Sequence, residues 1–573
     1  MQESKFTFEK SYVKERVLSK TTAAKYVAEF LRESGVTAFF FVPTVLSKAL
    51  ASMDAMPIKR VLTHGEKAAV YMADGYARAS GRPGVCAAQA IGAANLAAGL
   101  RDPFMAHSPV IALTGGRLPL QKHKFNYQEI DDYPLFNQVT KANFQVDVAS
   151  RLPDLLRQAF REATSGTPGP VNLQLAGKEG DVERELLDSP LIVEDLYTKV
   201  PPHRFAPEKE RLQEALRALN QAQRPVMVVG GGAKWSGARA EVRKFAEEFS
   251  IPVATSLNAY ALFPENHPLY IGVPGTYSRS CTNKILSRAD LVLFVGSQTG
   301  GLLTNFWRVP PAGTTVIQIG IDASDLGRNY PNVVSLLGDA KVTLEALADE
   351  TMQRNGWIAE VQGEVKTWRD EVQPLRESDA VPIRPERILK ELGDWLPNDA
   401  IVVCDTGHAG MWSAQQLWVD STDWDFMRAA GSLGWAFPAS IGAKCGAPER
   451  PVICFTGDGG FWYHLQELET AVRCGISTVT CVNNNNSLNQ ETAIFQAAYD
   501  GKPSKRQGEM WHFSPVNFAK IAESLGGVGI RVEKPSELRS AFDRALSSGK
   551  PAVIDIVSDV AALAPLAWEA TNP

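Results

Sequence analysis

The sequence is poor in the residues that mark disulfide-rich, redox-active or zinc-binding proteins. Only seven of its 573 residues are cysteine, and no two of them form a Cys-x-x-Cys pair. They are scattered along the chain at Cys86, Cys281, Cys404, Cys445, Cys454, Cys474 and Cys481. This pattern excludes a disulfide framework and a zinc ribbon. It favours buried free thiols in a reducing compartment, which predicts a cytoplasmic protein.

Long apolar runs and an excess of one charge are also missing. No apolar run approaches the roughly 18 residues that cross a bilayer, so the sequence predicts no membrane segment. Met1–Leu18 is polar and charged, unlike a signal peptide. The net charge of −5 argues against a nucleic-acid partner. With 45% apolar and 21% charged residues, the chain has the composition of a globular protein and the length of about three domains.

The most informative stretch runs from Val452 to Glu491. Val452–Phe455 is an apolar run of strand length that leads into Gly457-Asp458-Gly459. Apolar residues then recur at helical spacing over Phe461–Val472, which predicts one continuous helix. Thr478–Val482 predicts a second strand. The stretch therefore predicts a β-α-β unit whose parallel strands end side by side.

Polar side chains follow both of these strands. Asp458 comes after the first strand, and four asparagines, Asn483–Asn486, come after the second. A carboxylate and a carboxamide at one sheet edge suit Mg²⁺, whose remaining ligands are commonly phosphate oxygens. Glycines beside Asp458 would let the backbone approach a diphosphate. The other interpretation is an ordinary β-α-β unit with a glycine turn and a polar loop.

This stretch resembles the cofactor signature of the thiamin diphosphate (ThDP) enzymes, in which Gly-Asp-Gly is followed by paired asparagines. The resemblance implies that Asp458, Asn485 and the carbonyl of Ser487 hold Mg²⁺, with Asn484 as the alternative to Asn485. It also implies ThDP as the cofactor. The cofactor-binding set that it implies is Glu66, Gly407, His408, Leu433, Gly457, Asp458, Gly459, Gly460, Asn485, Ser487 and Leu488.

The segment THGEKAAVYMADGYARASGRPG resembles a second signature of the same family, with Gly65 inserted between His64 and Glu66. The family's glutamate hydrogen-bonds a ring nitrogen of the cofactor's aminopyrimidine, which makes Glu66 the expected catalytic residue. The inserted glycine removes His64 from the register of the motif. Glu66 also has a structural interpretation, because a carboxylate in the first turn of a helix is favoured by the helix dipole.

Four further residues are candidates by resemblance, and three of them, Gln128, His408 and Glu491, are expected to be catalytic, with proton transfer as the role of His408. Leu433 would be the apolar wedge that bends the cofactor, and His408 in DTGHAGMW lies in a cofactor loop. Gln128 lies in FNYQEIDDYPLFNQVTKANF, which is similar to acetolactate synthases. Glu491 stands where decarboxylases of the family carry a proton-transfer glutamate. The corresponding structural interpretations are a core leucine for Leu433, a structural or solvated histidine for His408, a polar loop or helix cap for Gln128 and a helix-terminal glutamate for Glu491.

The fold expected from the strand and helix pattern is α/β, with three doubly wound parallel-sheet domains. We expect an N-terminal pyrimidine-binding domain over residues 1–190, a Rossmann-like middle domain over 205–350, and a diphosphate-binding domain with a C-terminal tail over 384–573. Residues 188–207 read as a linker. The family resemblance allows FAD or ADP in the middle domain, although the FAD-binding arginine expected after Gly296 is missing.

The resemblance is specific for the cofactor and leaves the reaction open. Glu491 favours cleavage of a carbon–carbon bond beside a carbonyl, by a 2-hydroxyacyl-CoA lyase or a decarboxylase of the oxalyl-CoA type. The tail Val560–Pro573 would then act as a lid, or would simply be docked. An acetolactate synthase that condenses 2-oxo acids is the alternative, and a non-catalytic ThDP-fold subunit is a remote one. The family also implies a homodimer or homotetramer with active sites between chains.

Overall fold

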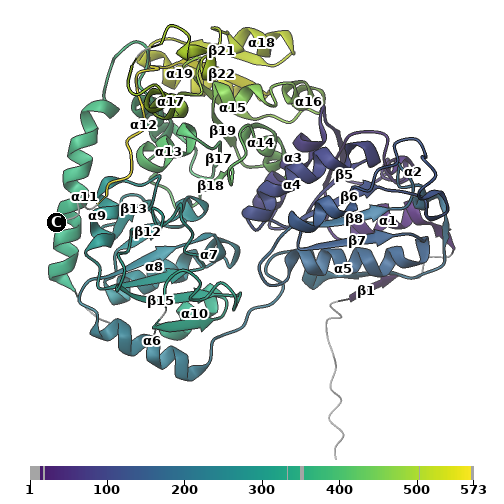
Figure 1. Ribbon diagram of the computed structural model, residues 1–573, viewed down its shortest axis with the longest axis horizontal. Helices are drawn as coiled ribbons and strands as arrows, with labels where there is room; N and C mark the ends of the chain where they lie inside the picture. Colours follow the sequence, from purple (N-terminus) through teal and green to yellow (C-terminus); the bar gives the residue numbers. More distant parts are fainter. Residues whose placement is uncertain (1–12, 17–19, 332, 349–353, 503, 570–573) are drawn as a thin grey trace, which may run out of the picture. The chain divides into compact units, whose positions relative to one another are not determined.

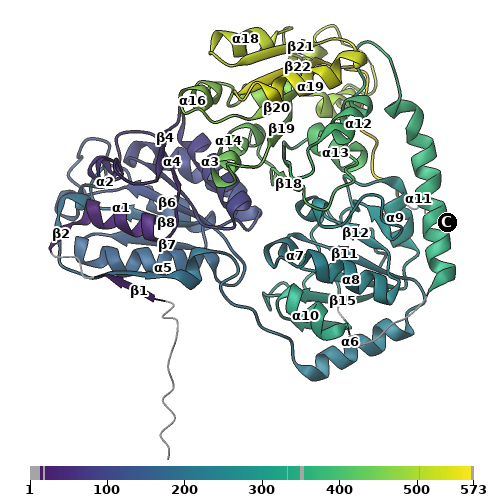
Figure 2. The ribbon, with the colours of Figure 1, turned by 180° about the vertical axis from the view of Figure 1, so that it is seen from behind.

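The computed structural model describes residues 13–16, 20–331, 333–348, 354–502 and 504–569. The chain divides into two compact units, residues 1–203 and 204–573. The first unit contains one six-stranded sheet and the second contains two (Figures 1 and 2). Neighbouring strands are parallel throughout these three sheets, and helices form most of the connections between successive strands. The predicted α/β class with three doubly wound sheets is therefore confirmed.

The sheet of the first unit is built from short apolar strands. Its order is β4 (Lys59–Leu62), β3 (Ala38–Phe41), β5 (Gly84–Ala88), β6 (Val110–Gly115), β8 (Val171–Leu175) and β7 (Ala142–Val146). Its helices are α1 (Ala23–Glu33), α2 (Ser47–Ser52), α3 (Glu66–Ser80), α4 (Ala93–Met105) and α5 (Leu152–Thr164). The chain runs from β3 out to β4 and then back to β5 on the other side of β3. The carboxyl ends of β3 and β5 thus form the switch point at which such sheets bind ligands.

The middle sheet begins the second unit. Its order is β13 (Tyr270–Gly272), β12 (Val253–Thr255), β11 (Pro225–Val229), β14 (Leu291–Val295), β15 (Thr315–Gly320) and β16 (Val334–Leu337). The helices are α6 (Lys209–Gln221), α7 (Gly231–Trp235), α8 (Arg239–Phe249), α9 (Ser280–Ser287) and α10 (Ala340–Leu347). The long helix α11 (Asn355–Arg376) then leads to the third sheet.

The third sheet has its switch point between β17 and β19. Its order is β18 (Asp425–Arg428), β17 (Ile401–Cys404), β19 (Val452–Gly457), β20 (Val479–Asn484), β22 (Ala552–Val557) and β21 (Val528–Val532). Its helices are α12 (Pro385–Trp395), α13 (His408–Gln416), α14 (Ala436–Gly446), α15 (Asp458–Trp462), α16 (Glu467–Arg473), α17 (Thr492–Ala498), α18 (Phe518–Ser524) and α19 (Leu538–Ser547). The strands β17, β19 and β20 therefore present their carboxyl ends next to one another.

Two predicted segments differ from the structure. The helix expected over Phe461–Val472 is divided into α15 and α16, because hydrogen bonds between residues three apart, such as Glu467 N to His464 O, replace the helical pattern there. The linker expected over residues 188–207 contains β10 (Leu191–Glu194). β10 pairs antiparallel with β1 (Val13–Arg16). Its alternate residues are buried against the first unit, so this part of the chain is a strand and not a free linker.

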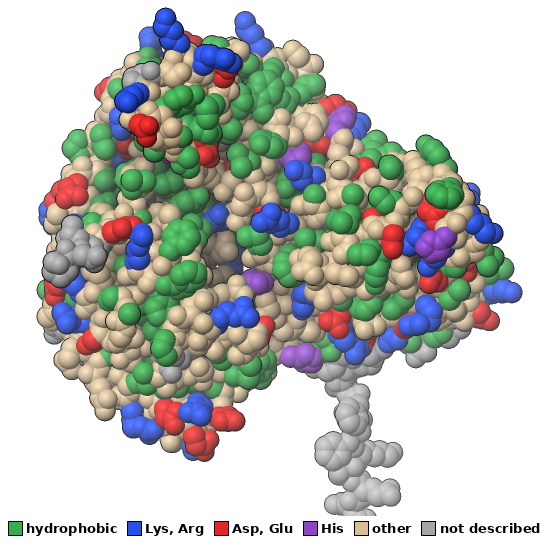
Figure 3. Space-filling view, viewed as in Figure 1, with side chains coloured by type: hydrophobic (Ala, Val, Ile, Leu, Met, Phe, Trp, Pro, Cys, Tyr) green, Lys and Arg blue, Asp and Glu red, His purple; other side chains and the backbone are tan. Residues whose placement is uncertain are grey.

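The surface agrees with the near-neutral charge of the sequence. Basic and acidic side chains are interspersed over the face drawn in Figure 3. Within the described ranges, no helix is long and apolar enough to cross a bilayer.

The approach of α3 to β5 positions the start of α3, where Glu66 lies. A methyl group on Gly84 would lie 1.9 Å from the backbone oxygen of Ala73. Because backbone atoms cannot yield to it, we expect Gly84→Ala to lower the free energy of unfolding by about 3 kcal/mol. Urea unfolding followed by circular dichroism measures this change.

The matched control for this variant is Gly363→Ala. Gly363 is an exposed residue of α11 with open space around its Cα. We expect its replacement by alanine to leave stability unchanged or to raise it by about 0.5–1 kcal/mol, because alanine favours the helix. Equal behaviour of the two variants would contradict the proposed close packing at Gly84.

Candidate functional site

The polar residues predicted from the sequence gather at the carboxyl edge of the third sheet. Gly407 and His408 follow β17, Asp458 follows β19, and Asn485 follows β20. Because these three strands are neighbours in one parallel sheet, their following loops lie side by side. Residues far apart in the sequence thus form one cluster within the second unit.

The Asp458 carboxylate is buried at the start of α15. Its side chain accepts a hydrogen bond from the backbone N–H of Ser487 at 3.0 Å, which joins the β19 and β20 loops. Burial raises the pKa of Asp458 to about 7, because water no longer solvates the charged form. A nearby cation would stabilise the charged form of a carboxylate in this environment.

The hydrogen bonds distinguish between the two candidate asparagines. Asn484 donates to the Asp555 carboxylate at 2.8 Å and to the carbonyl of Val516 at 3.0 Å, so its side chain holds the sheet edge together. The Oδ1 atom of Asn485 is buried and has no hydrogen-bond partner among the described residues. Asn485 therefore has the available oxygen, and this favours it over Asn484 as a ligand.

Asp405 organises the cluster and was not predicted from the sequence. Its buried carboxylate accepts hydrogen bonds from the Gly434 N–H at 3.1 Å and from the Thr456 hydroxyl at 3.0 Å. A methyl group on Gly460 would lie 2.7 Å from one of its oxygens. The side chain thus links the loop after β18 to β19 and α15. The single signal in the sequence is its position directly after β17.

Three predicted cofactor-loop residues lie close to this carboxylate. Gly407 has a φ of 68°, a conformation that favours glycine, and it begins α13. His408 follows it, and burial lowers the pKa of its imidazole to about 4, so that the ring is neutral at neutral pH. In the part of the chain that the structure describes, its Nδ1 atom is buried and lacks a hydrogen-bond partner. Leu433 is 39% exposed, although it is apolar.

The loop after β20 brings Glu491 to the same edge. Leu488 packs on Gly459, where a methyl group would lie 2.5 Å from its Cδ2 atom. Glu491 immediately precedes α17, without a capping hydrogen bond from its side chain, and is partly exposed. The predicted residues belong to two adjoining segments, the end of β19 with the start of α15 and the stretch that follows β20; they are Gly457, Asp458, Gly459, Gly460, Asn485, Ser487, Leu488 and Glu491.

The C-terminal tail is docked along the second unit as far as it is described. Asn489 donates to the carbonyls of Val560 and Ala562 at 2.9 and 3.2 Å. Asn283 donates to the carbonyl of Trp568 at 3.2 Å. The tail thus runs from the Asn489 loop to the middle domain. Residues 570–573 of the expected lid lie outside the described residues.

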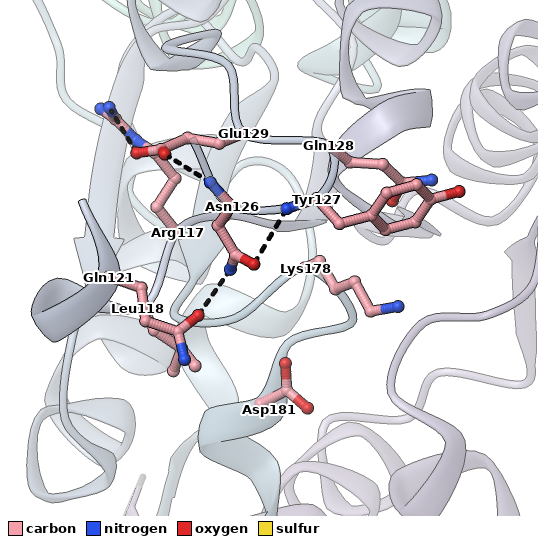
Figure 4. Close-up of a pocket in the computed structure, with 10 residues that line it drawn as sticks. Arg117, Leu118, Gln121, Asn126, Tyr127, Gln128, Glu129, Lys178 and Asp181 are labelled. Atoms are coloured by element: carbon pink, nitrogen blue, oxygen red, sulfur yellow. Dashed lines mark hydrogen bonds and ion pairs between the residues drawn. The ribbon is translucent and has the colours of Figure 1, made fainter. Parts of the chain in front are cut away.

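Glu66 and Gln128 belong to the first unit. Glu66 begins α3, and its carboxylate accepts a hydrogen bond from the Asn95 amide at 3.2 Å. A methyl group on Gly92 would lie 2.4 Å from its Oε1 atom, so this glycine gives the carboxylate its space. Gln128 has a φ of 62° and a buried Oε1 atom without a hydrogen-bond partner within the described ranges. It lines the pocket shown in Figure 4.

The second-unit cluster fits a divalent cation bound to a diphosphate. Its donors are oxygens of a carboxylate, a carboxamide and the peptide backbone, which is the donor set that Mg²⁺ takes. Coordination of a cation by the buried oxygens of Asp458 and Asn485 would stabilise the folded protein, because the chain alone leaves these oxygens poorly satisfied.

The glycine run of the middle domain does not fit a dinucleotide in the same way. A methyl group on Gly230 would lie 2.3 Å from the Gly296 oxygen, and Gly232 N donates to that oxygen at 2.9 Å. These glycines therefore allow two loops of the chain to pack on one another. A Gln298–Asp325 hydrogen bond of 2.7 Å continues this packing. The geometry of this loop gives no support to FAD or ADP.

Family comparisons assign the class of the protein. Residues 21–135 match the model of the N-terminal TPP-binding domain of thiamine pyrophosphate enzymes. Residues 212–347 match the central domain, and residues 405–556 match the C-terminal TPP-binding domain. Together with the three sheets, these matches define a ThDP-dependent enzyme.

Similar proteins narrow the assignment. A probable acetolactate synthase large subunit of Methanocaldococcus jannaschii is 33% identical over 562 residues, which are 95% of this chain and 93% of the relative. An acetolactate synthase large subunit of Corynebacterium glutamicum is 31% identical and covers 94% of this chain and 87% of the relative. The chain therefore belongs to the ThDP-dependent enzyme superfamily and is acetolactate synthase-like.

The raised pKa of Asp458 makes a prediction about stability. The unfolded chain loses this proton near the ordinary pKa of 3.8, and the folded chain loses it near 7. Because the folded state binds the proton more tightly, the free energy of unfolding falls as pH rises between these two values. We expect Asp458→Asn to stabilise the cofactor-free protein by about 2–4 kcal/mol at about pH 8, and by much less at about pH 5.

Denaturant unfolding at the two pH values measures this effect. Asp420→Asn is the matched control, because Asp420 is an exposed aspartate of the same domain and we expect no pH-dependent gain from its replacement. A gain of equal size at both pH values would contradict the burial of a charge at Asp458.

Proposed function

We propose that this chain is an acetolactate synthase-type carboligase, which joins two 2-oxo acids with loss of carbon dioxide. The observation that supports this choice is the similarity to acetolactate synthase large subunits over nearly the full length of both chains. It favours the synthase alternative over the lyase or decarboxylase that Glu491 suggested. In this reaction, one substrate loses its carboxylate as carbon dioxide, and its acyl carbon then bonds to the carbonyl carbon of the second.

The second unit would hold the cofactor. Asp458, Asn485 and the Ser487 carbonyl would bind Mg²⁺, and the glycines beside Asp458 leave room for a diphosphate. The exposed Leu433 would support the cofactor from below, held by the hydrogen bond of Gly434 to Asp405. When bound, ThDP supplies the electron sink for the carbon–carbon bond that breaks beside a carbonyl.

The first unit would supply the residue that controls protonation. The Glu66 carboxylate, oriented by Asn95, would hold a proton at a ring nitrogen of the cofactor. His408 is neutral at neutral pH, so it would act there as a hydrogen-bond partner rather than as a charged acid. Gln128 would contact the substrate. Glu491, at the end of the loop that follows β20, would help to position the substrate.

We further propose that each active site forms between two chains, with Glu66 from one and Asp458 from the other, in a homodimer or homotetramer. Apolar side chains of the first unit support an interface. They are Leu120, Phe125, Ile130 and Leu135, which are 88%, 100%, 57% and 51% exposed. Exposed apolar groups in one loop are typical of a surface that a partner covers.

Glu66→Gln tests the protonation role. We expect it to reduce turnover by about 100-fold or more, because general acid–base catalysis contributes on this scale, while ThDP binding stays within a few-fold of the wild type. Stopped-flow turnover and fluorescence titration with ThDP measure the two properties. Glu33→Gln is the control, since Glu33 lies at the far end of α1. Loss of ThDP binding to the same degree would assign Glu66 a structural role instead.

Complementation tests the arrangement between chains. Glu66→Gln and Asp458→Asn would each be inactive alone. A mixed dimer of the two contains one intact site if Glu66 and Asp458 come from different chains, so random mixing should restore about a quarter of the wild-type activity. Mixtures that stay inactive, although mixed dimers are detected by mass spectrometry, would place both residues in one chain's site.

Product analysis tests the reaction itself. The enzyme loaded with ThDP and Mg²⁺ is given pyruvate in one experiment and a 2-hydroxyacyl-CoA in another, and the products are identified by mass spectrometry. We expect acetolactate and carbon dioxide from pyruvate. Formyl-CoA from the thioester would establish the lyase instead. ThDP binding without turnover of either substrate would favour a non-catalytic subunit.

A further inference from the structure

The segment that follows β20 crosses the cofactor edge beyond the ladder of the sheet. The pairing of β20 with β22 ends at Asn484. Beyond it, the Ser487 N–H donates to Asp458 at 3.0 Å, and Leu488 packs on Gly459. The position of the proposed metal-binding carbonyl of Ser487 therefore depends on contacts that lie outside the sheet.

Part of this segment is held by the chain that follows α17. The Leu488 N–H donates to the carbonyl of Trp511, and the Phe513 N–H donates to the carbonyl of Asn486, both at 2.8 Å. The next turn of the segment reaches the β17 loop, because a methyl group on Gly407 would lie 2.8 Å from the Gln490 Oε1 atom. The segment thus covers both cofactor loops.

Asn489, between these contacts, joins the segment to the C-terminal tail. Its side chain is 4% exposed, and its amide donates to the carbonyls of Val560 and Ala562 at 2.9 and 3.2 Å. Its Oδ1 atom accepts from the Thr492 hydroxyl at 2.9 Å. Both the donors and the acceptor of the carboxamide are therefore used. A leucine of similar size could not make the two donations to the tail.

The tail is held at both ends, so it can support another segment. At its start, the Ser558 N–H donates to the carbonyl of Asn484 at 2.9 Å. Near the end of its described part, the carbonyl of Trp568 accepts from Asn283 of α9. Figure 1 shows the yellow end of the chain running from the third sheet towards this helix. Ala562 lies between the two ends and is buried.

We propose that Asn489 is a positioning residue, through which the tail keeps Ser487 and Leu488 in the conformation that binds Mg²⁺ and the diphosphate. The inference rests on the proposed cofactor site, and it does not depend on the choice between a carboligase and a lyase. A segment without this support has to be ordered when the cofactor binds, and that ordering lowers affinity. The docked tail therefore raises the affinity for the cofactor.

Titration of the folded chain with Mg²⁺ in the presence of ThDP, followed by fluorescence or calorimetry, tests this role. We expect Asn489→Leu to raise the Kd for Mg²⁺ by about tenfold or more, because two buried hydrogen bonds are lost. Truncation after Asp559 removes both accepting carbonyls and should raise the Kd by a similar factor. At saturating cofactor, kcat of Asn489→Leu should stay within about threefold of the wild type, because the groups at the reacting atoms are intact.

The matched control is Asn329→Leu. Asn329 also donates to two backbone carbonyls, those of Gln298 and Thr299 at 3.1 Å, but it lies in the middle domain. Its replacement should leave the Kd for Mg²⁺ within about twofold of the wild type. Asn489→Leu combined with the truncation should raise the Kd no further than either change alone, because both remove the same contacts. Factors that multiply would overturn the proposal, since the two changes would then act independently.

Unchanged Mg²⁺ affinity in Asn489→Leu would also overturn the proposal, and Asp458→Asn identifies which part of it fails. If Asp458→Asn weakens Mg²⁺ binding and Asn489→Leu does not, the cofactor site stands and the role of the tail is refuted. If neither variant weakens binding, the proposed cofactor site fails, and the role of Asn489 fails with it. Circular dichroism before each titration shows that the variants are folded.

Discussion

The buried carboxylate of Asp405 is the interaction on which the cofactor edge of the third sheet depends. A charge at this depth is costly unless donors surround it. Here the donors are the backbone of Gly434, the hydroxyl of Thr456 and the N–H of Thr406, which donates at 2.8 Å. These three groups come from three different segments. Satisfying one carboxylate therefore sets the relative positions of the loops that carry Leu433, Asp458 and His408.

The neighbouring Asp458 shows the opposite use of a buried carboxylate. Its pKa of about 7 records a charge that the chain alone does not satisfy well, as does the unpartnered oxygen of Asn485. Groups that serve only the fold are paired, as Asn484 is with Asp555. The unsatisfied oxygens are those expected to coordinate a cation. The folded chain is therefore less stable without a ligand at the positions where binding a ligand would stabilise it.

Much of the fold could be predicted from local pattern, and the failures have physical causes. The strand predicted over Val452–Phe455 begins at the same residue in β19 (Val452–Gly457), and the strand predicted over Thr478–Val482 matches β20 (Val479–Asn484) to within two residues, because apolar runs followed by turn or polar residues define buried parallel strands. The strand β12 has three residues, too few for a period to be recognised. The division between α15 and α16 arises from turn hydrogen bonds that apolar spacing does not reveal.

The site could be predicted only where a residue's type and neighbours in the sequence determine its task. Four consecutive asparagines are indistinguishable in sequence, and Asp555, distant along the chain, separates Asn484 from Asn485. Asp405 has no motif of its own.

Substrate choice depends on residues outside the cofactor signatures. Binding one cofactor requires the same few groups whatever the reaction, so a family signature identifies the chemistry and leaves the substrate open. Discrimination between a small 2-oxo acid and a thioester must come from side chains that touch the part of the substrate that differs. Gln128 lines a cavity of about 290 Å³ in the first unit, beside a loop shaped by contacts of Arg117 and Glu129. Under the proposed function, side chains of the first unit such as Gln128 would distinguish substrates, whereas Asp458 and Asn485 of the second unit would hold the cofactor and its metal whatever the substrate.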